Sequence, residues 1–505
     1  MKKEKRALIS VYDKTDILEF SKKLNQLGYE IISTGGTYKI LKENSIDVIE
    51  VSQITGFEEV MDGRVKTLHP SIHAAILARR DNQSDLLTLE KMQVIPIDIV
   101  VVNLYPFFEK QKIGLSDYEL TEFIDIGGPT MLRAAAKNYK DVIVVVDPKD
   151  YQEILEKIER NELDLSFRKK LASKVFSLTS AYDAAIANFL SNQEPGEYSC
   201  FSYKLGSKLR YGENPHQQGW LYLNTNGKGI FNNIQILNGK ELSYNNIKDI
   251  DSAVKIVYSF NDKVITAVKH NVPCSVAMGD ENIEDLFDKL YNADSLSIFG
   301  GIIATNQKIE KNLAEKLTSI FLEVIVSPDY SQEAIEILKT KKNLRVIRLL
   351  EKPTDLYEFC SIDGAILIQQ IDNFLDDQYD ENFKIVTEKK PDERQMRDLI
   401  FAQRVSKFVK SNAIVTAKDG VTCGICGGQT SRIWAAQNAL SRTPKGAILA
   451  SDGFFPFTDV VEEAYKYGIS AIIQPGGSLK DKDSIDLCNK YGIPMVFTGV
   501  RHFKH

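Results

Sequence analysis

Short apolar runs alternate with amphipathic stretches along the first part of the chain. Ala7–Val11, Glu30–Ser33 and Val48–Val51 are each short, apolar and bounded by turn residues, which predicts three buried strands. Between the first two runs, apolar residues recur at helical spacing at Ile17, Phe20, Leu24 and Leu27. Alternating strands and helices predict a parallel α/β sheet with right-handed crossovers.

The same alternation continues along the rest of the first domain. Strands are expected at Ile97–Leu104 and Asp141–Val146, with a helix that has Pro129 in its first turn between them. Residues 151–190 are rich in Lys, Glu and Ala, which predicts helix.

A linker candidate then divides the chain. Asn192–Glu197 contains Asn, Pro and Gly, so we predict a first domain at 1–195 and a second at 196–505, itself split near 360–395. The second half is again α/β, and we expect no internal repeat in it. Its expected strands are Ser297–Ala304, Glu323–Ser327, Leu344–Leu349, Ala365–Gln370, Ala413–Ala417, Ala447–Ala450, Ala471–Gln474 and Met495–Thr498.

Composition sets limits on the class of protein. A chain of 505 residues is too long for one core. With 26% charged residues and a net charge of −6, it has no general basic field for nucleic acid. No apolar run approaches the roughly 20 residues that span a bilayer, and we expect no signal peptide. The six scattered cysteines favour a reducing cytoplasm over a disulfide framework.

Two strand-to-helix turns in the first domain suit a phosphate group. Ser10–Lys14 and Ser33–Thr37 offer hydroxyls and free N–H groups where helices begin. Taken alone, a Ser-Thr-Gly-Gly-Thr turn is more often only a turn.

Polar residues also lie in other loops of this domain. The loop Gly63–Pro70 holds two cations and a histidine, for which a solvated surface cluster is the alternative interpretation. These loops bring their side chains together only if all lie at the carboxyl ends of the strands. The residues concerned are Lys66, Tyr105, Asp125 and Lys137.

The most informative stretch of the second half is Ile265–Cys274. Its first four residues predict a buried strand that ends at Lys269-His270, and Pro273 is expected to prevent further strand pairing. A lysine beside a histidine disfavours the imidazolium form, which predicts a neutral imidazole as base and the ammonium as proton donor. The alternative is a solvated strand end.

Four stretches of the second half are further candidates. Asn412 precedes a strand and could bond a substrate amide, although a helix end explains it equally well. Gly427–Arg432 leads into a helix with Arg432 near its start, which is a candidate anion site. Leu209–His216 is polar, with a cation and a histidine. Ser451–Phe457 carries three aromatic rings, which either pack in the core or wall a flat heteroaromatic ligand.

Metal chemistry has little support. Cys423 and Cys426 have the spacing of a metal pair, but a structural zinc site needs four ligands and there is no second pair. Cys274 follows a proline as in zinc deaminases, yet its downstream partner and a His-x-Glu are missing. We therefore predict no metal site.

Together these motifs resemble the bifunctional purine-biosynthesis family AICAR transformylase/IMP cyclohydrolase. The resemblance runs from Leu8 to His505, and cysteines at 274, 423 and 426 are departures that leave the expected catalytic positions intact. It is carried by Ser33–Thr37, Gly63–Pro70, Asn103–Phe107, Asp125–Pro129, Leu209–His216, Lys269-His270, Ser431–Ile433, Phe454–Phe457 and Arg501–His505.

The resemblance implies a methylglyoxal-synthase-like, doubly wound first domain followed by two cytidine-deaminase-like α/β subdomains. It implies that the second domain transfers a formyl group from 10-formyltetrahydrofolate to AICAR, and that the first closes formyl-AICAR to IMP with loss of water. It also implies a cytoplasmic homodimer with transformylase sites between its subunits. It implies chemistry that requires no metal. The expected partners are small molecules, and neither nucleic acid nor a membrane is expected.

Site residues are implied in the same way. His270 is the expected general base, Lys269 the proton donor, and Asn412 the group that orients the formyl. Lys66, Tyr105, Asp125 and Lys137 are expected to polarise the formyl oxygen and to transfer protons in ring closure. Which of them is the acid and which the base stays open. Substrate-binding residues implied in the first domain are Ser10, Lys14, Ser33, Thr34, Gly35, Gly36, Thr37, Arg64, Thr67, Asn103, Gly127 and Gly128. Those implied in the second are Arg210, Tyr211, Asn238, Phe299, Gly300, Ser431, Arg432, Ile433, Phe454, Pro456, Arg501 and His505.

Two other classes of function stay open on the residues alone. A zinc-dependent nucleobase deaminase would hold stoichiometric zinc. A nucleotide-sensing regulatory module would bind ligand without turnover, since methylglyoxal-synthase-like domains also serve as allosteric receivers. The second alternative gives no role to Lys269-His270.

Overall fold

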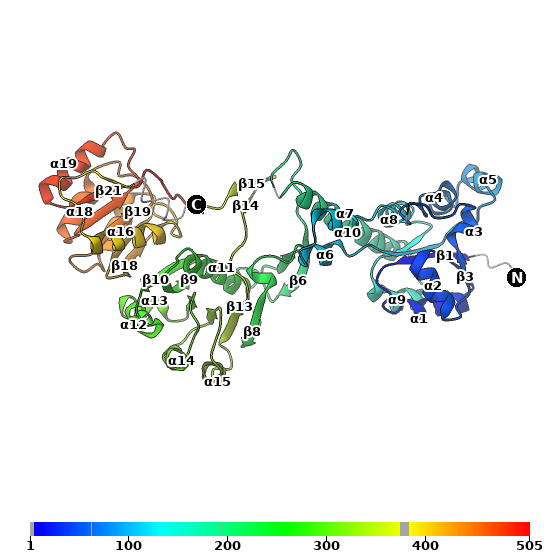
Figure 1. Cartoon of the computed structure of the whole chain (residues 1–505), viewed down its shortest axis with the longest axis horizontal. Helices are drawn as coiled ribbons and strands as arrows, with labels where there is room; N and C mark the ends of the chain where they lie inside the picture. The colour runs from blue at the N-terminus through cyan, green and yellow to red at the C-terminus, as the bar shows by residue number, and fades with distance from the viewer. Residues whose placement is uncertain (1–4, 62, 193, 374–382) are drawn as a thin grey trace. The chain divides into compact units, whose positions relative to one another are not determined.

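The computed structural model describes residues 5–61, 63–192, 194–373 and 383–505 (Figure 1). The chain divides into two compact units. Unit 1 ends at Lys204 and also includes Asn224–Gly227, and unit 2 comprises Leu205–Leu223 and Lys228–His505.

Unit 1 is built on a parallel sheet in the order β3-β2-β1-β4-β5. The central strands β1 and β4 are largely buried, as their apolar runs predicted, and the expected α/β class is confirmed. The strand order reverses between β1 and β4, which creates a crevice at their carboxyl ends. The strands are β1 (Lys5–Val11), β2 (Tyr29–Ser33), β3 (Val48–Glu50), β4 (Ile99–Asn103) and β5 (Ile143–Val145).

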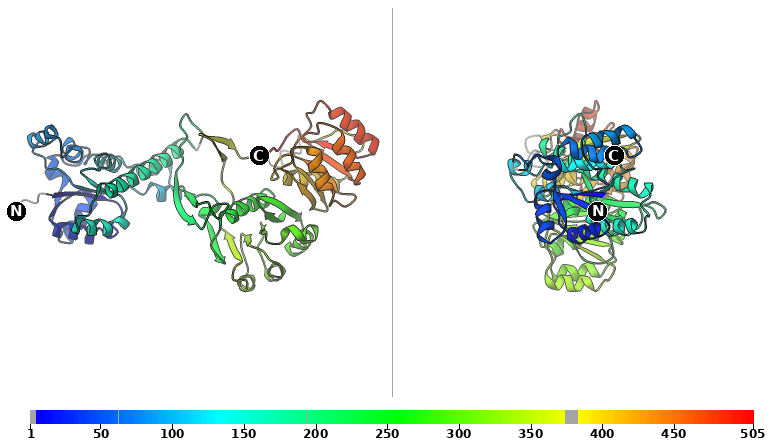
Figure 2. Two further views of the ribbon diagram at one scale, coloured as in Figure 1. Left: turned by 180° about the vertical axis from the view of Figure 1, so that it is seen from behind. Right: turned by 90° about the vertical axis from the view of Figure 1, so that its right-hand side faces the viewer.

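Helices cover this sheet, and the long helix α10 packs against α8 and β5 (Figure 2). In the described part of the chain, no helix combines the length and the apolar character needed to cross a membrane. The helices of unit 1 are α1 (Ile17–Gln26), α2 (Gly35–Glu43), α3 (Val51–Thr55), α4 (Pro70–Leu77), α5 (Gln83–Lys91), α6 (Phe107–Lys112), α7 (Asp117–Thr121), α8 (Gly127–Lys137), η1 (Pro148–Asp150), α9 (Tyr151–Glu159) and α10 (Leu165–Leu190).

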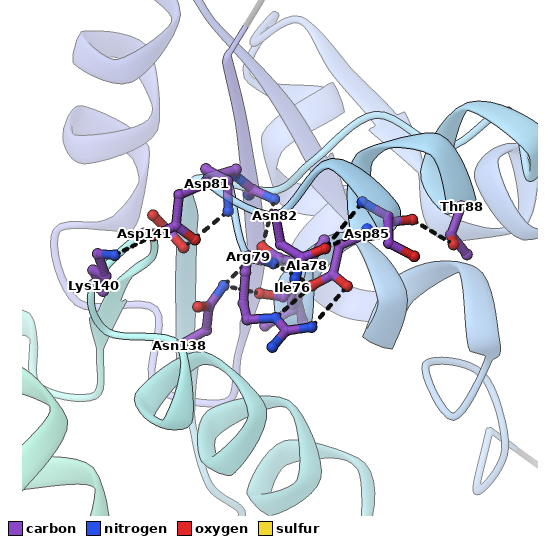
Figure 3. Close-up of polar contacts among 12 residues, drawn as sticks. Ile76, Ala78, Arg79, Asp81, Asn82, Asp85, Thr88, Asn138, Lys140 and Asp141 are labelled. Atoms are coloured by element: carbon purple, nitrogen blue, oxygen red, sulfur yellow. Dashed lines mark hydrogen bonds and ion pairs between the residues drawn. The ribbon is translucent and has the colours of Figure 1, made fainter.

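A polar network fixes the chain just past the C-terminal end of α8 (Figure 3). Asn138 donates through Nδ2 to the carbonyl oxygens of Ile76 (2.9 Å) and Ala78 (3.1 Å). Nearby, Arg79 Nε donates to Asp85 Oδ2 at 2.8 Å. The Asn138 bonds tie the end of α8 to the last turn of α4 and to the residue that follows it.

Unit 2 contains a twelve-stranded sheet in the order β16-β21-β20-β19-β17-β18-β10-β9-β11-β12-β13-β8. Two smaller sheets pair β6 with β7 and β14 with β15. The strands are β6 (Tyr203–Leu209), β7 (Gly219–Asn224), β8 (Ile234–Asn238), β9 (Lys263–Lys269), β10 (Val272–Gly279), β11 (Ile302–Thr305), β12 (Val324–Ser327), β13 (Arg345–Leu349), β14 (Tyr357–Ile362), β15 (Ala365–Gln370), β16 (Lys384–Ile385), β17 (Ile414–Lys418), β18 (Val421–Cys426), β19 (Ile448–Ser451), β20 (Ala471–Gln474) and β21 (Met495–Phe497).

The order of this sheet is an internal repeat, so our expectation of none was wrong. Outwards from its centre, the hairpins β10-β9 and β18-β17 are followed by strands in the same succession. Helices α11 and α16 precede the two hairpins and bury residues in one shared core. The helices of unit 2 are η2 (Ile230–Asn232), α11 (Tyr244–Tyr258), α12 (Ile283–Ala293), α13 (Ser295–Ile298), α14 (Lys311–Thr318), α15 (Gln332–Lys339), α16 (Glu393–Ser406), α17 (Arg432–Leu440), α18 (Asp459–Lys466) and α19 (Asp481–Tyr491).

Two further expectations near Lys269 were wrong. Pro273 does not end strand pairing, because β10 contains it and pairs antiparallel with β9, with an irregularity between Pro273 and Ser275. A bulge is a position where a strand tolerates a residue without an N–H group. The strand expected at Ser297–Ala304 begins only at Ile302. Its first residues belong to α13, and Gly300 has a positive φ (74°), which does not fit a strand.

The central position of β1 in the sheet of unit 1 yields a test of the fold. Leu8 is fully buried in its core, so Leu8→Ala should lower the free energy of unfolding by about 2–5 kcal/mol through loss of burial and an unfilled cavity. Chemical denaturation measures the change. The matched control is Leu190→Ala, because that side chain is 66% exposed. Equal effects of the two substitutions would contradict a core position for Leu8.

Candidate active sites

A cleft of about 930 Å³ opens in unit 1 where the strand order reverses. Gly35 lines an adjoining hollow of about 270 Å³. The cleft itself brings together most residues predicted for the first domain: Ser10, Lys14, Thr34, Gly36, Thr37, Arg64, Lys66, Thr67, Asn103, Tyr105, Asp125, Gly127 and Gly128.

Two predicted residues lie elsewhere. Ser33 is fully buried, and its hydroxyl donates to the carbonyl oxygen of Ile9 at 2.7 Å, so its role is structural. Lys137 is the last residue of α8, whereas the cleft lies at the first residue, Gly127. Ten residues of helix rise about 15 Å. The cleft therefore does not include Lys137, and the expected convergence is not found for this residue.

Asp125 is held at the first turn of α8. Its Oδ1 accepts the Gly128 N–H at 2.8 Å, and its Oδ2 accepts the Tyr105 N–H at 3.4 Å. A Cβ on Gly128 would lie 2.5 Å from Asp125 Oδ2, so only glycine leaves room for the carboxylate. Burial raises the pKa of Asp125, although these two N–H groups and Lys66 oppose the rise. Such a carboxyl is suited to proton transfer.

The surroundings also shift the pKa values of two other groups of the cleft, Lys14 and Tyr105. Burial lowers the pKa of Lys14, and the positive charge of Lys66 adds to the effect. Burial raises the pKa of Tyr105, and the negative charge of Asp125 adds to it. The cleft thus combines three cations, Lys14, Arg64 and Lys66, with the phenol of Tyr105 and the carboxyl of Asp125 in one partly desolvated space.

Side chains tie down the turn that follows β1. Asn103 Oδ1 accepts the Asp13 N–H at 2.9 Å, and its Nδ2 donates to the Asp13 carbonyl at 3.0 Å. Thr37 exchanges two bonds with the Val11 backbone. By contrast, the buried Thr34 hydroxyl has no hydrogen-bond partner among the described residues. Thr34 therefore remains available to a ligand, while Asn103 and Thr37 shape the backbone.

A larger pocket of about 1150 Å³ lies in unit 2 beside the β9–β10 hairpin. The predicted residues that line it are Arg210, Tyr211, Lys269, His270 and Gly300. Its lining also contains charged residues that the sequence patterns missed: Lys240, Glu241, Asp249, Glu323, Lys341, Lys342 and Arg345. The excess of cations suits an anionic ligand.

Lys269 and His270 belong to a tight hairpin turn. His270 (φ 56°) and Asn271 (φ 62°) are both left-handed, as a two-residue type I′ turn requires. Lys269 Nζ donates to the Phe299 carbonyl at 2.9 Å. Asp249, from α11, accepts the backbone N–H groups of His270 (3.3 Å) and Asn271 (2.6 Å). Burial raises the pKa of Asp249, while those two bonds oppose the rise.

A third pocket, of about 330 Å³, lies at the start of α17. Phe455 is not part of it, because this ring is fully buried in the core. The predicted residues that line it are Asn412, Ser431, Arg432, Ile433, Phe454 and Pro456. It also contains Thr430, Phe457 and Phe503, which belong to the candidate loops Gly427–Arg432, Ser451–Phe457 and Arg501–His505, and Asp459, which the patterns missed.

Arg432 is buried, and its partners are inside the protein. Its guanidinium forms an ion pair with Asp452 and donates to Ser451 Oγ at 2.7 Å and to Asn412 Oδ1 at 2.8 Å. Asn412 in turn donates through Nδ2 to the Gln429 carbonyl at 2.9 Å. The expected anion site at Arg432 therefore lacks a free charge, and the contacts give Arg432 the role of orienting Asn412.

Four predicted residues line none of these pockets. Asn238 donates to the carbonyl oxygens of Lys341 (3.1 Å) and Leu344 (2.8 Å), which joins the end of β8 to the residues just before β13. The guanidinium of Arg501 lies over the Phe503 ring, 4.9 Å from its centroid. The four are Asn238, Phe299, Arg501 and His505.

The cysteines of β18 pack against a hydrophobic cluster. Burial raises the pKa of Cys423 to about 11 and also raises that of Cys426, which disfavours the thiolate that binds metals. Among the described residues, no group of three or more His, Cys, Asp or Glu side chains could hold a metal ion.

The family comparisons agree with a chain that holds two kinds of site. Residues 16–130 match the model of the MGS-like domain, and residues 135–442 match that of the AICARFT/IMPCHase bienzyme. The fold and sites thus define a two-activity enzyme with an MGS-like N-terminal domain, and the chain belongs to the AICARFT/IMPCHase bienzyme family.

Relatives that match over the full length of the chain define the kind of enzyme more closely. The "Bifunctional purine biosynthesis protein PurH" of Clostridium botulinum (strain Loch Maree / Type A3) is 58% identical over 99% of this chain and 100% of the relative. The protein of that name from Clostridium acetobutylicum is 56% identical over the same shares. A solved structure, "Crystal structure of ForH", is 35% identical over 38% of this chain and 100% of its own, with a TM-score of 0.35.

The particular enzyme follows from these relatives. The chain is a bifunctional enzyme of purine biosynthesis that combines formyl transfer to AICAR with ring closure to IMP. Its family uses a folate co-substrate. The resemblance seen in the sequence motifs is confirmed.

The contact between Gly128 and Asp125 yields a test of the unit 1 cleft. Gly128→Ala should lower the kcat for ring closure of supplied formyl-AICAR by about 10–100-fold, because the new Cβ displaces the Asp125 carboxylate. Formyl transfer should be unchanged. Gly196→Ala is the matched control, since a Cβ there meets nothing within 4 Å. Wild-type ring closure in Gly128→Ala would contradict a catalytic position for Asp125.

Proposed function

We propose that the unit 1 cleft closes formyl-AICAR to IMP and that the pocket beside the β9–β10 hairpin transfers the formyl group. The observation that carries this assignment is the position of Lys269-His270, at a turn that lines the most cationic of the three pockets. AICAR carries a phosphate, which Arg210 and the lysines of this pocket would bind.

In the transfer, His270 is the general base. The 5-amino nitrogen of AICAR is delocalised and weakly nucleophilic, so the imidazole removes its proton as the nitrogen attacks the formyl carbon of 10-formyltetrahydrofolate. The bond from that carbon to the folate nitrogen then breaks, and Lys269 supplies a proton to the departing nitrogen. The Lys269 bond to the Phe299 carbonyl supports this role, because it restrains the ammonium group.

In ring closure both reacting groups are on one molecule, so positioning supplies much of the rate. The carboxamide nitrogen attacks the formyl carbon, and the former formyl oxygen leaves as water. Lys66 polarises that oxygen, and Asp125 with Tyr105 moves the protons. Lys14 and the N–H groups at the start of α2 hold the 5′-phosphate. The shifted pKa values of Asp125 and Tyr105 support these roles.

A cytoplasmic homodimer is part of the proposal. Asn412 is the group expected to orient the formyl, yet it lines a different pocket from His270. Two copies of the chain that bring one pocket of each together would complete two transformylase sites. The aromatic rings Phe454 and Phe457 would then face the flat pterin of the folate.

Paired substitutions test the division of labour. His270→Ala should lower formyl transfer by about 100-fold or more and leave ring closure of supplied formyl-AICAR intact, since only transfer uses the imidazole base. Lys66→Ala should lower ring closure and leave formyl transfer intact. Both activities are measured on the purified full-length chain. Equal loss of both activities in either variant would count against two separate sites.

Mixing two inactive variants tests the dimer. In a mixed dimer of His270→Ala and Asn412→Ala subunits, one site has both residues intact only if they act across subunits. After subunit exchange of equal amounts, we expect formyl transfer to return to about a quarter of the wild-type rate. Each variant incubated alone is the control. No recovery, with exchange verified by differently tagged subunits, would refute a shared site.

A further inference from the structure

The turn that carries His270 is held by a carboxylate from another element. Asp249 is the sixth residue of α11, and its two oxygens accept the N–H groups of both central turn residues. Oδ2 accepts from His270 at 3.3 Å, and Oδ1 from Asn271 at 2.6 Å. The contact spans 21 and 22 positions of the chain.

The second repeat contains the same contact at its own hairpin. Asp398 is the sixth residue of α16, and it accepts the N–H groups of Asp419 (2.9 Å) and Gly420 (2.8 Å) in the turn between β17 and β18. The separations are again 21 and 22 positions. We call this arrangement the carboxylate clamp.

The geometry of the turn explains why a clamp is useful. In a two-residue hairpin turn, the N–H groups of both central residues face away from the strand ladder and need another acceptor. A carboxylate with two oxygens satisfies both through charge-assisted bonds. It also favours the left-handed conformation that exposes these two groups on one side.

The two turns differ in their residues. Asp-Gly, at 419–420, is among the pairs most favoured in a type I′ turn. His270 and Asn271 also have positive φ, although a histidine is uncommon there. A residue that fits its local conformation poorly is expected at functional sites, where the surrounding structure maintains it.

We propose that Asp249 is a positioning residue for formyl transfer: by clamping the turn it fixes the backbone from which the His270 imidazole reaches the pocket. The proposal rests on the role proposed above for His270. Asp249 lines the same pocket as His270. The equivalent turn of the second repeat presents Asp419, which forms an ion pair with Arg394, so the clamp at Asp398 serves the fold.

The repeat supplies a matched pair of variants. Asp249→Asn and Asp398→Asn each keep one acceptor oxygen and lose the other, in equivalent positions of the full-length chain. We expect similar decreases in Tm. Only Asp249→Asn should lower kcat for formyl transfer, by about 10–100-fold, while KM for AICAR changes less than about 3-fold. Ring closure of supplied formyl-AICAR should be unchanged in both.

The outcomes separate the positioning role from the role of His270. Equal loss of formyl transfer in Asp249→Asn and Asp398→Asn would reduce the clamp to a structural contact and overturn the proposal. Formyl transfer lost in His270→Ala but retained in Asp249→Asn would overturn the positioning role alone. Formyl transfer retained in His270→Ala would overturn the proposed catalytic assignment itself.

A second substitution in the same turn gives a test by rescue. Asn271→Gly introduces the residue that the other repeat has at this position, and glycine adopts positive φ without help. Added to Asp249→Asn, it should restore kcat at least about 3-fold, because the turn then depends less on the clamp. A double variant no faster than Asp249→Asn would contradict a role for the clamp in holding the turn.

Discussion

Backbone N–H groups that no strand or helix can pair are the constraint on which both candidate sites depend. Such groups occur at tight turns, and leaving them unpaired in a partly buried place costs free energy. In unit 1 Asp125 accepts N–H groups from Tyr105 and Gly128, and in unit 2 Asp249 accepts those of the His270 turn. The same bonds that satisfy the backbone therefore fix the positions of Asp125 and of the His270 turn, to which we assign catalytic roles.

The hydrogen bonds to these N–H groups also affect the pKa values of the two carboxyl groups. Burial raises the pKa values of Asp125 and Asp249, and the bonded N–H groups oppose that rise in both. A carboxylate that is bonded in this way can remain in a pocket without a full ion pair. Arg432 shows the other solution, because its buried charge is neutralised by Asp452. The same guanidinium donates to Asn412 Oδ1 and so supports that side chain.

Unit 2 illustrates how one architecture serves two purposes. Its two repeats meet at the centre of the sheet, where the Met278 N–H donates to the Gly420 carbonyl at 2.8 Å. Each repeat has a helix, a clamped hairpin and a lysine just before the turn, Lys269 in one and Lys418 in the other. Only one of the turns carries a histidine. The fold repeats, whereas the residues at the two turns differ, and we propose a catalytic role for only one of them.

The sequence by itself determined the strands of unit 1 and the convergence of Lys66, Tyr105 and Asp125, because apolar period and parallel topology together place strand-following loops at one edge. It also supplied the motifs that identified the family. Only the tertiary structure decided that Pro273 lies in a paired strand, that Lys137 is at the far end of its helix, and that Asp249 accepts the N–H groups of the His270 turn. These features depend on the register of strands and the packing of distant segments, which local patterns do not encode.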